Sequence, residues 1–334
     1  GCSQRIQRTY LRRLITLALF ADSFAQSDLT GRFVMPTITP LDASFGAVVT
    51  DVKIANMNAT EWQAVEDAFH QYAALVFPGQ HPSEDDQIAF GQRFGNIELL
   101  RPDPTKKAVP ITNLKEDGTP YTKEEFRFKT LRGNEGWHTD SSYMPLAAKA
   151  SILAAIQVPS KGGETALSDM RSAYDKLDEV TKGKIDGLSA YHSLYQSQAK
   201  NGFTFKTGDG YGYHTKGAPL RPLVKTHPVT GRKSLFIGRH AYEIPGMSIK
   251  DGQALLDDLL EFAVRPPRVY AHQWQPGDVM MWDNRCILHR ACPYDHSEIR
   301  IMRHVRVAGE VESELVETGR DNLAEDFQPS ASNR

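Results

Sequence analysis

Apolar residues recur every three to four positions in three stretches of the chain, the spacing of a helix with one buried face. These stretches are residues 60–73, 83–94 and 247–264, and each begins at a Thr or Ser suited to cap a helix. Shorter helical patterns cover residues 171–177 and 180–188. The pattern therefore predicts a small set of helices spread along a long chain.

Between the helices, short apolar or alternating runs separated by turn residues predict strands. They are residues 35–52, where Pro residues indicate edge strands, and 74–77, 151–158, 165–168, 223–226, 234–237, 268–273, 278–282, 287–289 and 299–307. Many short strands with turns roughly every eight to twelve residues are typical of a β-sandwich or jelly roll. We expect a mainly β fold with helices on its outside.

Composition divides the rest of the chain into two polar loops, one domain and two terminal segments. Residues 101–132 and 197–217 are rich in Gly, Lys and other polar residues, and we interpret both as long loops able to act as a lid. Residues 1–34, with a basic pair before a short apolar run, are expected to be an N-terminal extension or targeting segment. One domain is expected over residues 35–310, followed by a flexible C-terminal tail, residues 311–334.

Charge and cysteine content exclude some classes of protein. The formal net charge is −2, without the basic excess that binding to a nucleic-acid backbone rewards. No apolar run approaches the roughly 20 residues that cross a bilayer, which excludes an integral membrane protein. Three scattered cysteines do not form a disulfide framework and fit a reducing, cytoplasmic location. A small molecule is the expected partner.

Two histidines and an aspartate carry the candidate chemistry. His138 and Asp140 lie two residues apart in an extended stretch, so their side chains share one face. His289 follows far downstream in another strand-like stretch. Two histidines and one carboxylate form the facial triad of Fe(II) oxygenases, which leaves coordination positions open for co-substrate and O2. A zinc site at Cys286, His289 and Cys292 is the competing interpretation, although strand period places His289 opposite both cysteines.

An arginine eleven residues after His289 adds a second function. Arg300, Met302 and His304 share one face of the alternating run 299–307. Arginine is suited to bind a carboxylate through two parallel hydrogen bonds. The distal carboxylate of 2-oxoglutarate would be its partner.

These residues belong to motifs that resemble the TauD/TfdA family of 2-oxoglutarate dioxygenases. The motifs are Trp137-His138-Thr139-Asp140-Ser141-Ser142-Tyr143, Gly162-Gly163-Glu164-Thr165, Thr226-His227-Pro228-Val229-Thr230-Gly231-Arg232, and the stretch from Trp282 to Arg290. The similarity extends over residues 35–307, and residues 281–290 with Tyr294-Asp295 are most similar to the 2,4-dichlorophenoxyacetate dioxygenase branch. The resemblance implies a double-stranded β-helix, a jelly roll.

The resemblance also implies roles for single residues. His138, Asp140 and His289 would hold Fe(II), while Thr165 and Arg300 would bind the distal carboxylate of 2-oxoglutarate. Asn134 matches a family position near the substrate. A homo-oligomer is common in the family and is left open here.

The chain departs from the family pattern at the substrate. Members that bind sulfonates or carboxylates place an arginine four residues after the 2-oxoglutarate arginine, where this chain has His304. His304, or Arg303 if the strand has a bulge, could bind the substrate instead, and Arg239 or His240 could contribute.

We therefore expect a dioxygenase that hydroxylates a small, aryloxyalkanoate-like molecule and releases succinate and CO2. The alternatives are a taurine, alkyl sulfonate or sulfate ester dioxygenase, and a non-catalytic jelly-roll binding protein.

Overall fold

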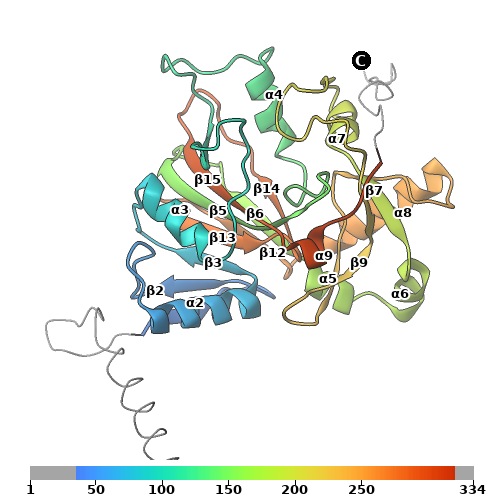
Figure 1. The fold of residues 1–334 in the computed structure, drawn as a ribbon, viewed down its shortest axis with the longest axis horizontal. Coiled ribbons are helices and arrows are strands. Elements are labelled where there is room, and N and C mark those ends of the chain that lie inside the picture. Colours follow the sequence, from blue (N-terminus) through green and yellow to red (C-terminus); the bar gives the residue numbers. More distant parts are fainter. Residues whose placement is uncertain (1–34, 320–334) are drawn as a thin grey trace, which may run out of the picture.

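The computed structural model describes residues 35–319. The predicted N-terminal extension and residues 320–334 of the predicted tail lie outside the described residues. The largest sheet has seven strands in the order β1-β2-β3-β13-β5-β15-β4 (Figure 1). Their bounds are β1 Thr37–Pro40, β2 Ala47–Thr50, β3 Ala74–Phe77, β13 Val279–Asp283, β5 Ala148–Gln157, β15 Ile301–Ala308 and β4 Ala108–Thr112.

Three smaller sheets complete the β structure of the described residues. A three-stranded sheet has the order β12-β6-β14, a second has the order β11-β7-β8, and β9 pairs with β10. The bounds are β12 Val269–His272, β6 Thr165–Asp169, β14 Ile287–Ala291, β11 Ala241–Tyr242, β7 Ser189–His192, β8 Leu220–Pro222, β9 Val224–Thr226 and β10 Lys233–Leu235. The strands predicted at residues 223–226 and 234–237 correspond to β9 and β10, which pair antiparallel.

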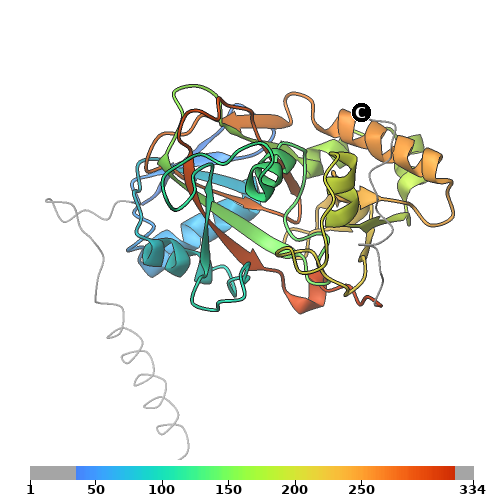
Figure 2. The same cartoon turned by 90° about the horizontal axis from the view of Figure 1, so that it is seen from above.

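The described helices lie outside these sheets (Figures 1 and 2). They are α2 Ala59–Tyr72, α3 Glu84–Gln92, α4 Phe126–Gly133, α5 Met170–Asp175, α6 Glu179–Ile185, α7 Leu194–Lys200, α8 Ile249–Ala263 and α9 Val311–Glu314. Ser83 and Ser248 cap α3 and α8 as predicted. Helix α2 begins one residue earlier than predicted, because Asn58 forms a capping box with Glu61. No helix in residues 35–319 has both the length and the apolar character needed to cross a bilayer.

Two apolar layers hold the sheets in place. Phe69 of α2 and Phe90 of α3 pack on one face of the seven-stranded sheet, against residues such as Ile152. On the opposite face, Met280 and Met302 belong to a core shared with residues of the three-stranded sheet, among them Leu167 and Ile287. Two facing sheets around a common core form the jelly roll that the sequence predicts.

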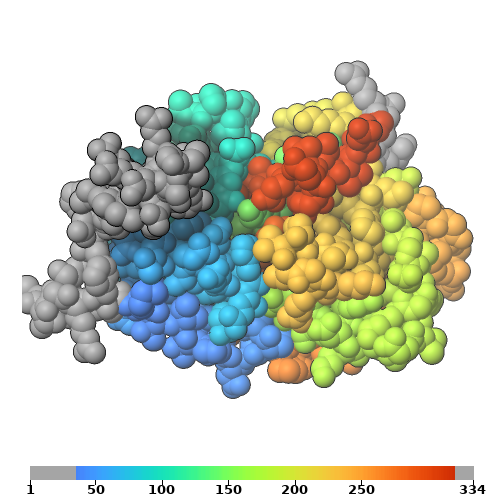
Figure 3. Space-filling view, turned by 60° about the horizontal axis from the view of Figure 1, so that its bottom comes forward, coloured from blue at the N-terminus to red at the C-terminus, as the bar shows by residue number. Residues whose placement is uncertain are grey.

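Three segments differ from the sequence-based expectation. The predicted loop 101–132 contains β4, an edge strand paired with β15, and the helix α4. The predicted loop 197–217 begins inside α7. The tail was expected to be flexible from residue 311, yet Val311–Glu314 forms α9, and the Glu314 carboxylate is buried against the Lys225 ammonium at 2.5 Å. Figure 3 shows this C-terminal segment, in red, lying against the yellow segment of the chain.

Candidate active site

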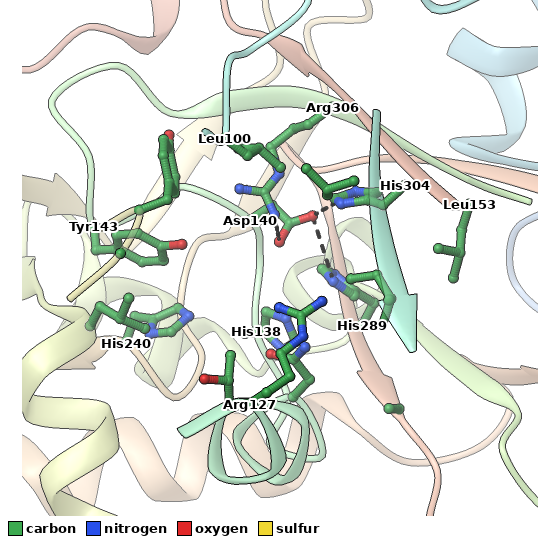
Figure 4. Close-up of a pocket in the computed structure, with 18 of the residues that line it drawn as sticks. Leu100, Arg127, His138, Asp140, Tyr143, Leu153, His240, His289, His304 and Arg306 are labelled. Atoms are coloured by element: carbon green, nitrogen blue, oxygen red, sulfur yellow. Dashed lines mark hydrogen bonds and ion pairs between the residues drawn. The ribbon is translucent and has the colours of Figure 1, made fainter. Parts of the chain in front are cut away.

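Backbone pairing brings the two candidate histidine ligands together. The His138 N–H donates to the His289 carbonyl at 2.9 Å, and the His289 N–H donates to the His138 carbonyl at 2.8 Å. One ligand atom each of His138, Asp140 and His289 lies within 4.8 Å of the other two, and all three residues are buried. Figure 4 shows the three side chains converging on one side of the cavity. The structure thus brings together three residues that the sequence separates by up to 151 positions.

The protonation states of the histidines suit a divalent metal. Burial lowers the pKa of His138 well below its usual value and that of His289 to about 4, so both imidazoles are neutral at pH 7. His138 Nδ1 lies 2.7 Å from the Gly136 carbonyl, which fixes the proton on Nδ1 and leaves Nε2 as the ligand atom. Neutral imidazoles and an ionised carboxylate are the donor set that Fe(II) takes in a facial triad, so these residues fit the ion.

Asp140 is held ionised and in a fixed orientation. Its Oδ1 accepts from Arg306 Nη2 at 2.7 Å and its Oδ2 accepts from Ser151 Oγ at 2.5 Å. Burial by itself would raise the pKa of Asp140, but Arg306 and the surrounding histidines hold it well below its usual value. Such outer partners orient a metal ligand and tune its basicity.

Arg306 also connects Asp140, through Ser141 and Glu98, to Tyr211. Its Nη1 donates to Ser141 Oγ at 2.9 Å, and Ser141 Oγ donates to Glu98 at 3.0 Å. The Tyr211 hydroxyl donates to the same Glu98 carboxylate. Arg306, Glu98 and Tyr211 are not among the residues predicted from the sequence. The alternation that places Arg300 and His304 on one face reaches Arg306 two residues later, so Arg306 could have been found.

The two candidate residues for 2-oxoglutarate lie on the same cavity. Thr165 is buried in β6, and its hydroxyl accepts from Trp274 Nε1 at 3.1 Å. Arg300 is buried just before β15, and its Nε donates to the Gly163 carbonyl at 3.1 Å. Gly163 has a φ of +71°, and a Cβ there would lie 3.2 Å from the Arg300 side chain, so a glycine allows this approach. No described residue bonds the two terminal nitrogens of Arg300, which remain free for a carboxylate.

A cavity of about 330 Å³ surrounds the triad, within the size range of small-molecule sites. Its apolar lining comes from several elements, and the residues are Leu100, Val109, Ile111, Phe126, Tyr143, Leu153, Leu194, Tyr211, Tyr213, Trp282 and Ala291. Asn134, the C-cap residue of α4, also lines it. Arg303 does not, because its guanidinium bonds Gln87 Oε1 at 2.7 Å and the Pro82 carbonyl at 2.6 Å. The strand is thus regular at Arg303, and the structure does not bring this predicted residue to the site.

His304 lies beside the metal ligands. Its Nε2 is 3.6 Å from Asp140 Oδ2 (Figure 4), and burial, with the Arg306 charge, lowers its pKa to about 4. A neutral imidazole does not replace the cationic arginine that other family members have at this position. An anchor for an anionic substrate would therefore have to come from elsewhere in the cavity.

Arg239 is a half-buried cation with few hydrogen-bond partners among the described residues. Its Nη2 lies 3.5 Å from Ser197 Oγ, while Nε and Nη1 have no hydrogen-bond partner among the described residues. Burial lowers its pKa to about 10, so it is charged at pH 7. Next to it, Ser197 Oγ donates to the Leu194 carbonyl and lies 2.9 Å from His240 Nδ1. Both Arg239 and His240 line the cavity.

The structure gives no support to the zinc interpretation. Within residues 35–319, Cys286, His289 and Cys292 do not form a cluster of ligand atoms. A second cluster, His227, Asp283 and Cys286, has its polar atoms occupied. His227 Nδ1 accepts from the Val229 and Thr230 amides, and Asp283 binds His227 Nε2 and the guanidinium of Arg285.

The jelly roll, the His-Asp-His cluster and the Arg300 guanidinium on the same cavity define a metal-dependent oxygenase of the 2-oxoglutarate type. Comparison with known proteins agrees: residues 37–308 match the model of the taurine catabolism dioxygenase TauD, TfdA family. The chain belongs to this family and is an α-ketoglutarate-dependent dioxygenase, with α-ketoglutarate (2-oxoglutarate) as co-substrate.

Two similar dioxygenases and one solved structure show which members of the family this chain resembles. An (S)-phenoxypropionate/α-ketoglutarate dioxygenase of Sphingobium herbicidovorans is 49% identical, over 83% of this chain and 96% of that protein. A 2,4-dichlorophenoxyacetate dioxygenase of Cupriavidus pinatubonensis is 39% identical, over 79% and 94%. The crystal structure of AAD-2 in complex with Mn(II) and N-oxalylglycine superimposes with a TM-score of 0.74 at 38% identity, covering 82% of this chain and 98% of that one.

Proposed function

We propose that this dioxygenase hydroxylates 2-aryloxyalkanoic acids, of the phenoxypropionate type, at the carbon that bears the ether oxygen. The observation that carries the proposal is Arg239, a half-buried cation whose buried Nε and Nη1 have no partner among the described residues and which lies beside apolar and aromatic residues of the cavity wall. An aryloxy acid has the complementary features, a carboxylate and an aromatic ring. The relatives named above act on substrates of this class.

The roles of the residues follow from their positions. His138, Asp140 and His289 would hold Fe(II), and Thr165 with Arg300 would hold the distal carboxylate of 2-oxoglutarate. Bound Fe(II) supplies oxidation by O2, in which 2-oxoglutarate loses CO2 to become succinate and one oxygen atom enters the substrate C–H bond. Arg239 would hold the substrate carboxylate, and Asn134 would contact the substrate nearby.

The product of this hydroxylation breaks down without further oxidation. A hydroxyl on the ether carbon gives a hemiketal or hemiacetal. The bond between that carbon and the aryloxy oxygen then breaks. The hydroxyl oxygen becomes a carbonyl oxygen and its proton passes to the aryl oxygen, which leaves as a phenol. Aryloxypropionate would therefore yield pyruvate and a phenol. The cavity walls, Tyr143 and Tyr211 among them, exclude water until the substrate has reacted.

The test is a substrate panel with succinate and phenol measured together. Protein loaded with Fe(II) and 2-oxoglutarate receives the (R) and (S) enantiomers of 2-aryloxypropionate, 2,4-dichlorophenoxyacetate, taurine and alkyl sulfates. We expect succinate and an equal amount of phenol with aryloxy acids. Succinate release with taurine or an alkyl sulfate alone would replace the proposal by the sulfonate or sulfate alternative, since Arg239 can bind those anions as well.

Arg239→Gln tests the anchor directly. Because the charged hydrogen bonds to the substrate carboxylate would be lost, we expect KM for the aryloxy acid to rise about 10- to 100-fold, equivalent to roughly 1.4–3 kcal/mol. The affinity for 2-oxoglutarate should change little. Arg232→Gln is the matched control, because Arg232 lies in the β9–β10 turn and pairs with Asp175 on the surface. An unchanged KM in Arg239→Gln would remove Arg239 from this role.

We also propose a cytoplasmic enzyme without a nucleic-acid partner. Cys286 and Cys292, the two cysteines among the described residues, are free thiols, in agreement with a reducing compartment, and the net charge of −2 does not favour nucleic acid. Sedimentation of the purified protein would decide between a monomer and the homo-oligomer that the family resemblance leaves open.

A further inference from the structure

Two arginines lie at the mouth of the cavity, apart from the residues given a role so far. Arg101 is exposed on the segment between α3 and β4, and Arg127 extends from α4 into the cavity (Figure 4). Both belong to the cavity lining. Phe126, next to Arg127, lines the same cavity and is 42% exposed, which marks this side as the opening to solvent.

Neither arginine is neutralised by a carboxylate. Among residues 35–319, Arg127 Nη2 donates to the Pro110 carbonyl, and no ion pair within 4.0 Å involves Arg101 or Arg127. Burial lowers the pKa of Arg127, and the nearby Arg101 charge lowers it further. Two acidic residues of the same segment have other partners: Asp103 accepts from Thr105, and Glu125 pairs with Lys115 at 3.0 Å. Two close, unpaired cations at an opening would attract an anion.

The charge of the cavity differs sharply from that of the chain. Five arginines line the cavity, Arg101, Arg127, Arg239, Arg300 and Arg306, with Asp140 as the one carboxylate of the lining. The whole chain has a net charge of −2. A cleft lined by one sign of charge raises the local concentration of the opposite ion and accelerates its association. Arg306 is neutralised by Asp140, and Arg300 is buried whereas Arg101 is exposed, so the outer pair meets an arriving anion first.

We propose that Arg101 and Arg127 form an outer anion subsite, which captures the carboxylate of an incoming organic acid before it moves inward to Arg300 or Arg239. The acids are 2-oxoglutarate and, resting on the proposed function, the aryloxy acid. The subsite raises the association rate and contributes little to the final bound state, because neither acid has a carboxylate left for it once seated.

The experiment measures association rates rather than turnover. Anaerobic protein loaded with Fe(II) is mixed with 2-oxoglutarate in a stopped-flow instrument, and the visible absorbance of the complex gives the association and dissociation rates. The variant is R101Q/R127Q. Its matched control is K106Q/K123Q, which removes two charges from exposed lysines of the same segment that do not line the cavity.

We expect the association rate of R101Q/R127Q to fall about 5- to 30-fold at low salt, with little change in the dissociation rate. The loss should shrink to less than about twofold near 0.5 M salt, where charges are screened within a few ångströms. The control should stay within about twofold throughout. An unchanged association rate, an equal loss in the control, or a loss that salt does not reduce would each overturn the proposal.

A second arm adds an aryloxy acid to the preformed complex and follows the change in the same absorbance. Its failure with wild-type protein would count against the proposed substrate, while the 2-oxoglutarate arm would still decide the subsite. The single variant R101Q guards against misfolding, because Arg101 is exposed and makes no side-chain bond to a described residue. Its association rate should fall in the same direction by a smaller factor.

Discussion

At the scale of single residues, the metal ligands could be predicted and their partners could not. The two-residue spacing of His138 and Asp140 and the later His289 indicate the triad because strand geometry is periodic and local. Strand alternation places Arg306 on the face of Arg300 and His304, but Arg306 holds Asp140 across 166 positions of sequence, and no local rule indicates that pairing. Arg239 belongs to none of the sequence motifs. What distinguishes it as a candidate anion-binding residue is that its Nε and Nη1 are buried without a partner among the described residues.

Arg306→Met tests the support of Asp140. The substitution leaves a buried carboxylate without its cationic partner, which costs roughly 3–5 kcal/mol of stability and frees Asp140 to rotate. We expect Mn(II) affinity to fall about 10- to 100-fold, measured by anaerobic calorimetry beside a thermal unfolding curve. Arg303→Met, on the same strand but bonded away from the cavity, should keep its metal affinity. Equal affinities in the two variants would contradict this role for Arg306.

Asp283 should control part of the acid sensitivity of the fold. Burial would raise the pKa of Asp283, but Arg285 and His227 hold it well below its usual value. As pH falls below about 5, the unfolded chain takes up a proton at this carboxyl while the folded protein does not, so acid favours unfolding. The stability that Asp283 contributes is thus present above its unfolded pKa and is lost as pH falls.

The comparison is urea unfolding at pH 7 and near pH 4. Asp283→Asn should be less stable at pH 7 and should lose less free energy on acidification, by up to about 1.4 kcal/mol per pH unit. Asp258→Asn, on an exposed position of α8, should keep the wild-type dependence on pH. An acid response in Asp283→Asn as steep as that of the wild type would show that other carboxylates are responsible.

At the scale of elements, the sequence predicts those whose signals are local. Helices α3 and α8 follow from serine caps and apolar spacing. Helix α4 was missed because its N-cap residue, Glu125, makes no side-chain cap bond and its sequence is mostly polar. Strand β4 was missed because Pro110 interrupts it and its pairing partner, β15, is remote. Helix α9 depends on Lys225, 89 positions away.

Arg221 on β8 joins two segments that lie far apart in the sequence, residues 142–145 and the C-terminal segment at Glu314. Its guanidinium donates to the carbonyls of Ser142, Met144 and Pro145, at 2.7, 2.7 and 3.1 Å, and to that of Glu314 at 3.2 Å. The segment that follows the metal ligand Asp140 is thus tied to the C-terminal segment through one buried side chain.

Arg221→Met should loosen both segments together. Four backbone carbonyls lose a charged donor, and the two in fully buried hydrogen bonds, those of Ser142 and Glu314, cost about 1–3 kcal/mol each if left unsatisfied. We expect faster hydrogen exchange of amides in residues 141–147 and 311–316, by at least tenfold, with amides of α2 nearly unchanged. Arg232→Met, at an exposed ion pair, should leave exchange at both segments as it is. Uniform acceleration over the whole chain would indicate global destabilisation instead of a local tie.

At the scale of the whole molecule, the site lies where the two facing sheets of the jelly roll meet. His289 comes from the three-stranded sheet, whereas His304 and Arg306 come from the seven-stranded one, and Asp140 lies between them (Figure 4). A metal ion bound to the triad therefore links the three-stranded sheet, through His289, to the seven-stranded sheet, through Asp140 and its partner Arg306. Binding energy at the site should appear as stability of the entire domain.

Thermal unfolding with and without ligands measures this coupling. A metal at 100 times its Kd adds about 2.7 kcal/mol, or roughly 5 °C in Tm for a chain of this size. We expect 2-oxoglutarate to add a further increase only when Mn(II) or Fe(II) is present, because the co-substrate would bind partly through the ion. His289→Ala should lose both increases, while His272→Ala, whose imidazole pairs with Asp278 outside the site, should keep them. A 2-oxoglutarate effect of the same size without metal would mean that Arg300 and Thr165 bind the co-substrate independently of the triad.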